Sequence, residues 1–249
     1  MRCLKHEIRF KLNAWTVIAL VLGLILFLPM AEILWHLTLP AENWEHLRNT
    51  VLGQYIKGSL ILVFGTAILS IILGVSSAWL VSCCEFPGRK FFEWTLILPL
   101  AIPTYIAAYA YFDLLDRLNP LLIWIRINIS VEVMTMISDT IVYPVTIIVL
   151  ASVLYPYVYL VARVAFTKQS NHFTEAARTL GHGAHSTFWR VALPLARPAI
   201  VGGVSLVIME TLNDYGAVEH FNIPTFTTGI FRTWLSAGDL SGALRLAAC

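Results

Sequence analysis

Glu175–Gly181, with the sequence EAARTLG, is followed nine residues later by Val191–Pro194, with the sequence VALP, and these two stretches are the most informative part of the sequence. They lie between two long apolar segments, one ending at Arg163 and the other beginning after Arg197. The carboxylate of Glu175 suits the first turn of a helix, alanine and leucine favour helix, and glycine commonly ends one. We therefore predict a short polar helix that connects two membrane spans.

The composition is that of an integral membrane protein. Of 249 residues, 58% are hydrophobic and 13% are charged, and the mean hydropathy is +0.74, whereas a soluble domain has about 25% charged residues. The net charge of +2 is too small to indicate a nucleic-acid partner. The four cysteines show no metal-ligand spacing, and P-loop and hydrolase motifs are absent from the sequence. We expect no cofactor and no enzymatic activity.

The apolar segments predict an all-α, polytopic transmembrane bundle, because a helix needs about 20 apolar residues to cross a bilayer core. We place five spans and the start of a sixth within a single domain, 1–249, which looks truncated in its last helix. The five spans are Leu12–Ala31, Gly58–Cys84, one between Glu93 and Asp113, one between Asp139 and Arg163, and one after Arg197; the sixth begins at Leu240. Tyr215–Asp239 is expected to be a loop or a re-entrant segment.

The positive charges give the orientation, since Lys and Arg concentrate in cytoplasmic loops. Eleven of the seventeen fall on one side if the N-terminus is cytoplasmic. These eleven are Arg2, Lys5, Arg9, Lys11, Arg89, Lys90, Arg163, Lys168, Arg178, Arg190 and Arg197. The same assignment puts the loop 163–197 in the cytoplasm, and this placement rests on the distribution of Lys and Arg alone.

The third span carries Pro99 and Pro103. Proline removes a backbone donor and clashes with the preceding turn, so this helix is predicted to be kinked or locally open. Either the kink only improves packing, or a broken helix with Tyr105 beside it lines a translocation path. Tyrosines here and at the end of span four are explained by interfacial aromatic belts, with metal ligation as the alternative.

The fifth span contains two carboxylates, Glu210 and Asp214, which lie four residues apart on one helix face. Counted from Pro198, they lie about 18 and about 24 Å into the membrane. A charge in lipid costs at least about 2.5–3.5 kcal/mol, so such groups face a bundle interior or a water-filled cavity. Three interpretations remain open: a metal station for a hard cation, contacts for docking or gating, and a structural pairing or capped helix end.

The polar loop resembles the EAA loop of ABC-transporter permeases, Glu-Ala-Ala-x3-Gly-x9-Ile-x-Leu-Pro, with valine in place of isoleucine. The matching residues are Glu175, Ala176, Ala177, Gly181, Val191, Leu193 and Pro194. In that family the loop touches the ATPase. The resemblance therefore implies a permease subunit of a type I ABC importer in the bacterial inner membrane, with a cytoplasmic ATPase dimer and a periplasmic substrate-binding protein as partners.

Other stretches resemble the ferric-iron importer permeases and imply iron(III) import by alternating access. They are Phe86–Arg89, Leu98–Tyr105, Ala108–Tyr111, Glu210–Gly216 and Pro224–Ile230. Permeases of this subgroup typically carry two halves, each with an EAA loop. This sequence has one such loop, so it looks like an N-terminal half that requires a second permease half or copy.

Three alternatives to iron import are open at this stage. The first is an ABC permease for another solute, such as a polyamine, thiamine or an oxyanion, although two acidic residues on the path argue against an anion. The second is a secondary transporter driven by an ion gradient, which leaves the EAA spacing without an explanation. The third is an inactive truncated product.

Overall fold

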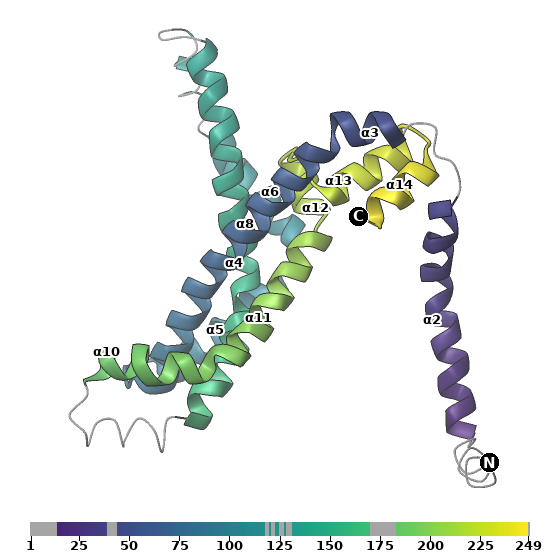
Figure 1. Ribbon diagram of the computed structural model, residues 1–249. Helices are drawn as coiled ribbons and strands as arrows, with labels where there is room; N and C mark the ends of the chain where they lie inside the picture. Colours follow the sequence, from purple (N-terminus) through teal and green to yellow (C-terminus); the bar gives the residue numbers. More distant parts are fainter. Residues whose placement is uncertain are drawn as a thin grey trace, which may run out of the picture. The chain divides into compact units, whose positions relative to one another are not determined.

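A computed structural model describes residues 14–38, 44–117, 120, 123–124, 127, 131–169 and 183–248 (Figure 1). All regular structure in these residues is helical. The chain divides into two compact units, Met1–Val51 with Gly229–Cys249 and Leu52–Thr228. The predicted all-α fold is thereby confirmed.

Three long helices form the centre of the larger unit: α4 (Leu52–Cys83), α8 (Val131–Gln169) and α11 (Leu193–Asn213). Figure 1 shows α4 and α11 running alongside α8. Glycines permit the close approach. A Cβ on Gly74 of α4 would lie 2.8 Å from the Cβ of Val158, and one on Gly203 of α11 would lie 2.9 Å from the Cα of the same valine. Small residues at such contacts are typical of membrane helices.

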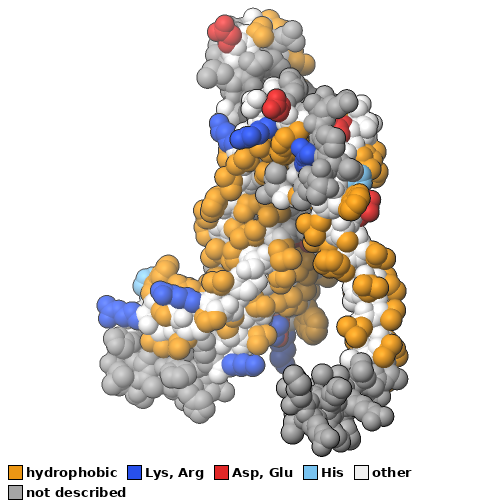
Figure 2. Space-filling model, turned by 45° about the vertical axis from the view of Figure 1, so that its right-hand side comes forward, with side chains coloured by type: hydrophobic (Ala, Val, Ile, Leu, Met, Phe, Trp, Pro, Cys, Tyr) orange, Lys and Arg blue, Asp and Glu red, His pale blue; other side chains and the backbone are white. Residues whose placement is uncertain are grey.

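Four helical stretches are long and apolar enough to cross a membrane. They are Trp15–His36, Leu52–Cys83, Thr140–Lys168 and His185–Asn213. A fifth crossing is possible where two shorter pieces, Arg89–Ala101 and Thr104–Asp113, meet at an angle of 91°. Figure 2 shows hydrophobic side chains covering the long helices on the visible face, as expected of surfaces in lipid. The count agrees with the five predicted spans.

Several helix boundaries differ from the predicted spans: α4 begins at Leu52 rather than Gly58, and α8 extends beyond both Asp139 and Arg163. Helix α2 (Ala14–Thr38) continues well beyond Ala31, because Glu32 and His36, whose side-chain atoms lie 3.2 Å apart, are one helical turn from each other and support that turn. Helix α11 does not begin after Arg197. It continues from α10 (Ala184–Thr187) through a π-helical turn, η2 (Phe188–Ala192), which ends two residues before the helix-disfavouring Pro194.

The segment after α11 is built from short pieces, as the sequence predicted. They are α12 (Gly216–His220), α13 (Phe226–Phe231) and a π-helical turn, η3 (Arg232–Ser236). Between α12 and α13, Asn222 has a positive φ of 54°. The carbonyl oxygen of Pro224 would clash with a Cβ on Gly58, so this segment packs directly on the backbone of α4.

The smaller unit contains α2, α3 (Trp44–Thr50), η3 and α14 (Leu240–Ala247). The carboxylate of Asp239 caps α14 by accepting a hydrogen bond from the Gly242 amide at 2.8 Å. The Arg245 guanidinium lies 5.8 Å from the Trp44 ring centroid. Helix α14 stands where the sequence predicted the start of a sixth helix.

Candidate functional site

The broken third span is the first part of the site. Its first arm is α5 (Arg89–Thr95) followed by a 3-10 turn, η1 (Leu98–Ala101), and its second arm is α6 (Thr104–Asp116). Pro99 occupies the first turn of η1, and Pro103 directly precedes α6. Proline suits these positions because the amide it lacks would have no helical partner there. The predicted opening at the two prolines is confirmed.

Side chains of α8 hold the first arm in place. The Tyr155 hydroxyl donates to the Leu96 carbonyl at 2.9 Å, and the Tyr159 hydroxyl donates to the Glu93 carbonyl at 3.1 Å. One turn further along α8, Arg163 forms an ion pair with the Glu93 carboxylate. These bonds satisfy carbonyls that a helix end leaves without partners. For two of the tyrosines at the end of span four, the structure thus shows a function that the aromatic-belt interpretation did not include.

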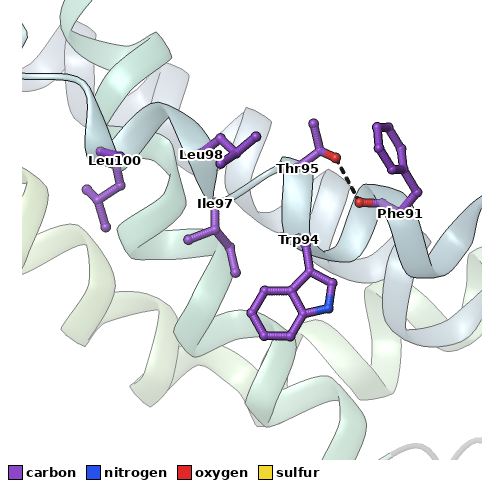
Figure 3. A pocket seen from close by; sticks show the side chains of 7 residues that line it. Phe91, Trp94, Thr95, Ile97, Leu98 and Leu100 are labelled. Carbon is purple, nitrogen blue, oxygen red and sulfur yellow. Dashed lines mark hydrogen bonds between the residues drawn. The ribbon is translucent and has the colours of Figure 1, made fainter.

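An apolar hollow of about 630 Å³ lies along the first arm (Figure 3). Its lining residues are Phe91, Trp94, Thr95, Ile97, Leu98, Leu100 and Ala101. Trp94 is 75% exposed, and the one hydroxyl of the lining, on Thr95, donates to the Phe91 carbonyl at 2.8 Å. This lining suits apolar groups and offers nothing that would hold an ion.

A second hollow, of about 460 Å³, has polar groups from tyrosine, glutamate and histidine in an otherwise apolar lining. Helix α6 contributes Tyr105 and Tyr109, and the start and body of α12 contribute Tyr215, Gly216, Glu219 and His220. The contact between the two elements is tight, because a Cβ on Gly216 would lie 2.8 Å from the Cβ of Tyr105. The His220 ring packs against Tyr109, with 4.3 Å between ring centroids. The structure therefore places the predicted path residue Tyr105 beside groups that the sequence analysis did not select.

The residues of this hollow carried a spacing signal in the sequence. Tyr105 and Tyr109 are four residues apart, and so are Tyr215 and Glu219, so each pair can share one helical face. Nothing in the sequence shows that α6 and α12 pack together. That contact follows from the break at Pro103 and is a tertiary feature.

The two carboxylates of the fifth span lie in different environments. Asp214 is 8% exposed, and its Oδ1 accepts a hydrogen bond from the Ala217 amide at 2.8 Å, so it caps α12. Its carbonyl accepts a further hydrogen bond from the Thr227 hydroxyl at 3.0 Å. Glu210 has an exposed side chain one turn before the end of α11. Within the described residues, no three His, Cys, Asp or Glu side chains gather closely enough to hold a metal ion.

Of the predicted coupling loop, 163–197, the structure describes residues 163–169 and 183–197. Val191 is half-buried in η2, and Leu193 and Pro194 begin α11. An aromatic cluster anchors this return to the membrane, with Trp79 of α4 at 5.5 Å from Phe166 of α8 and 5.0 Å from Phe188 of η2, between ring centroids. The other four predicted coupling residues lie outside the described residues: Glu175, Ala176, Ala177 and Gly181.

The spans, the break and the anchored loop end define a class, that of polytopic helical membrane proteins with an interrupted span. Residues 70–233, more than half of the chain, match the family model described as binding-protein-dependent transport system inner membrane component. The chain belongs to that family, and it is accordingly a multi-pass protein of the inner membrane type.

The names of similar proteins refer to three different substrates: iron, sulfate and molybdenum. The Fe(3+)-transport system permease protein FbpB 2 of Haemophilus influenzae is 27% identical over 94% of this chain, which spans 42% of that protein. The sulfate transport system permease protein CysT of Escherichia coli is 28% identical over 78% of the chain and 69% of its own length. The molybdenum transport system permease protein ModB of Escherichia coli is 29% identical over 72% of the chain and 78% of its own length.

Proposed function

We propose that this chain is a membrane-spanning permease subunit of an ATP-driven ABC importer. The observation that carries the proposal is the EAA-type spacing from Glu175 to Pro194, which lies inside the family match. Its partners would be a cytoplasmic ATPase dimer and a periplasmic substrate-binding protein. Because the chain spans 42% of the iron permease relative, we include a second permease half or copy among them.

The proposed mechanism is alternating access. ATP binding closes the ATPase dimer, the loop within 163–197 moves with it, and the motion reaches the membrane through η2 and the start of α11. The cluster of Trp79, Phe166 and Phe188 supports this route, because it packs η2 against both α4 and α8. The loop is cytoplasmic if the N-terminus is cytoplasmic, as the Lys and Arg distribution favours.

Gly181→Val tests the coupling step in the complete transporter. A β-branched residue resists the left-handed conformation in which glycine ends a helix, so the loop would leave its helix at a different angle. We expect membrane insertion to remain normal and ATP-driven uptake to be lost. Gly183→Val is the control, because a Cβ at Gly183 meets no atom within 4 Å. Normal uptake by the Gly181→Val transporter would refute the coupling role.

For the substrate we propose iron(III). Support comes from the FbpB 2 relative, which matches 94% of the chain, and from the acidic residues Glu210, Asp214 and Glu219 in and near α11 and α12. A hard cation prefers such oxygen ligands. The competing candidate is an oxyanion, favoured by the similarity to the sulfate and molybdenum permeases. Uptake of labelled iron, sulfate and molybdate by the reconstituted transporter decides between them, and uptake of either oxyanion without iron would reject the iron proposal.

A further inference from the structure

We propose that the polar hollow between α6 and α12 is a binding station for a hard cation of the iron(III) class. Its ligands come from the Tyr109 and Tyr215 phenols, the Glu219 carboxylate and the His220 imidazole, all of which line the hollow. The inference rests on the proposed import function and deepens it. It also places cation recognition at α12, apart from the carboxylate pair that the sequence suggested.

The charges of the lining residues favour a bound cation over a bound anion. Of the six residues around the hollow, one is acidic, three are tyrosines and none is Lys or Arg. An oxyanion there would face the Glu219 carboxylate, and no lining residue would offer it a Lys or Arg side chain. Carboxylate and phenolate oxygens, in contrast, are hard ligands, and tyrosine is an established protein ligand of iron.

His220 supplies an independent observation. Its Nε2 atom is buried and has no hydrogen-bond partner in the structure. Buried polar atoms are nearly always satisfied, and His220 is one of the residues that line the hollow, so its unpaired ring nitrogen indicates a missing partner. The ring itself is held between Tyr109 and Phe112, at 4.3 and 4.5 Å between centroids. A cation in the hollow would give Nε2 the partner it lacks.

The packing preorganises the station. Gly216 contacts Tyr105 directly, and Asp214 fixes the first turn of α12 through its bond to the Ala217 amide. Asp214 is therefore a positioning residue for the station. One wall of the hollow is α6, the second arm of the broken span, which begins just after Pro103, and the other wall is α12. A change in the angle of that break would move Tyr109 away from Glu219 and release the ion.

Binding exchanges protons for metal without a redox step. Each phenol that binds the cation forms an oxygen–iron bond and releases its proton to water, while the iron remains iron(III).

The test is a titration of the purified full chain in detergent micelles with iron(III) citrate. Phenolate ligation gives a visible charge-transfer band, which reports binding without any transport assay. We expect a saturable band, and we expect Tyr109→Phe and Glu219→Gln each to weaken binding by about tenfold or more, as loss of even a supporting residue does at metal sites. Tyr111→Phe is the matched control on the same helix, since Tyr111 lines a different hollow with Asp113 and Arg117.

Several results would overturn the station. One is the absence of a band, and another is a band that the Tyr109 and Glu219 variants leave unchanged, which would mean adventitious binding. A band lost in Glu210→Gln but retained in Glu219→Gln would move the ion to α11. Displacement of iron by sulfate or molybdate would assign the hollow to oxyanions. Circular dichroism and gel filtration identify any variant that fails to fold. If Tyr109→Phe fails to fold, the test rests on Glu219→Gln alone.

Uptake by the reconstituted transporter separates this inference from the proposed function. If wild-type protein imports iron but the isolated chain gives no tyrosinate band, the station is wrong and iron import stands. If the transporter imports only an oxyanion, iron import is wrong and the station loses its basis. Import of iron that Glu219→Gln reduces and Tyr111→Phe does not would support both.

Discussion

Two adjacent glycines of α11 provide a direct measurement of how tightly this helix packs on α8. A Cβ on Gly203 would lie 2.7 Å from Cγ2 of Val161 and 2.9 Å from the Cα of Val158. A Cβ on Gly202 meets nothing within 4 Å. Gly203→Ala therefore forces α11 away from α8, whereas Gly202→Ala adds a methyl group in open space.

The magnitudes follow from two opposing effects. Overpacking by one methyl group against backbone costs about 1–3 kcal/mol, while alanine is a better helix former than glycine by about 0.8–1.0 kcal/mol. The second effect is common to both variants and cancels between them. We expect Gly203→Ala to be less stable than Gly202→Ala by about 1–3 kcal/mol, a factor of roughly 5–150 in the unfolding equilibrium.

The assay is reversible unfolding in mixed micelles of mild detergent and SDS, followed by tryptophan fluorescence and circular dichroism. The comparison of the two alanine variants is more informative than either alone, because chain length, helix and detergent are the same. Equal midpoints for Gly202→Ala and Gly203→Ala would refute the close contact between α11 and α8, and with it the three-helix centre.

Three further predictions use the same unfolding assay. Tyr155→Phe removes a hydrogen bond to the end of α5 and should cost about 1 kcal/mol, with Tyr157→Phe as its control. Asp214→Ala should cost about 0.5–2 kcal/mol and expose α12 to proteolysis, while Asp214→Asn keeps most of the cap. Arg163→Met and Glu93→Gln should each cost about 1–3 kcal/mol, less than a fully buried pair because the side chains are 29% and 27% exposed. The double variant should lose less than the sum, and strict additivity would mean that the pair does not interact.

Much of the helical architecture follows from composition and proline placement. A run such as Leu52–Cys83 can only be buried in lipid or in a bundle, so hydropathy alone identifies it. Pro99 and Pro103 also determined the position of the break, since a proline removes its donor in any helix. The angle between the arms was not predictable, because it depends on what α8 and α12 present to each arm.

The anchoring of the first arm shows why the rest could not be read from sequence. Tyr155, Tyr159 and Arg163 recur every four residues on α8, and this pattern alone fits a lipid interface as well as a protein contact. Their partners are the carbonyls at Leu96 and Glu93 and the Glu93 carboxylate, sixty or more residues away in most cases. Backbone acceptors have no sequence signature, so only the packed structure reveals these bonds.

Asp214 shows how a tertiary contact that the sequence does not reveal changes the assignment of a cation ligand. The sequence made Glu210 and Asp214 equivalent, since both were carboxylates within a span and four residues apart. In the structure, one oxygen of Asp214 is committed to the Ala217 amide, while Glu210 stays exposed on α11. If the pair held a cation, Asp214→Asn would abolish binding, although the α12 cap would largely survive. If the station between α6 and α12 holds it instead, Asp214→Asn should reduce binding only modestly, while Glu219→Gln should nearly eliminate it. The ratio of these two effects therefore separates a ligand from a residue that positions one.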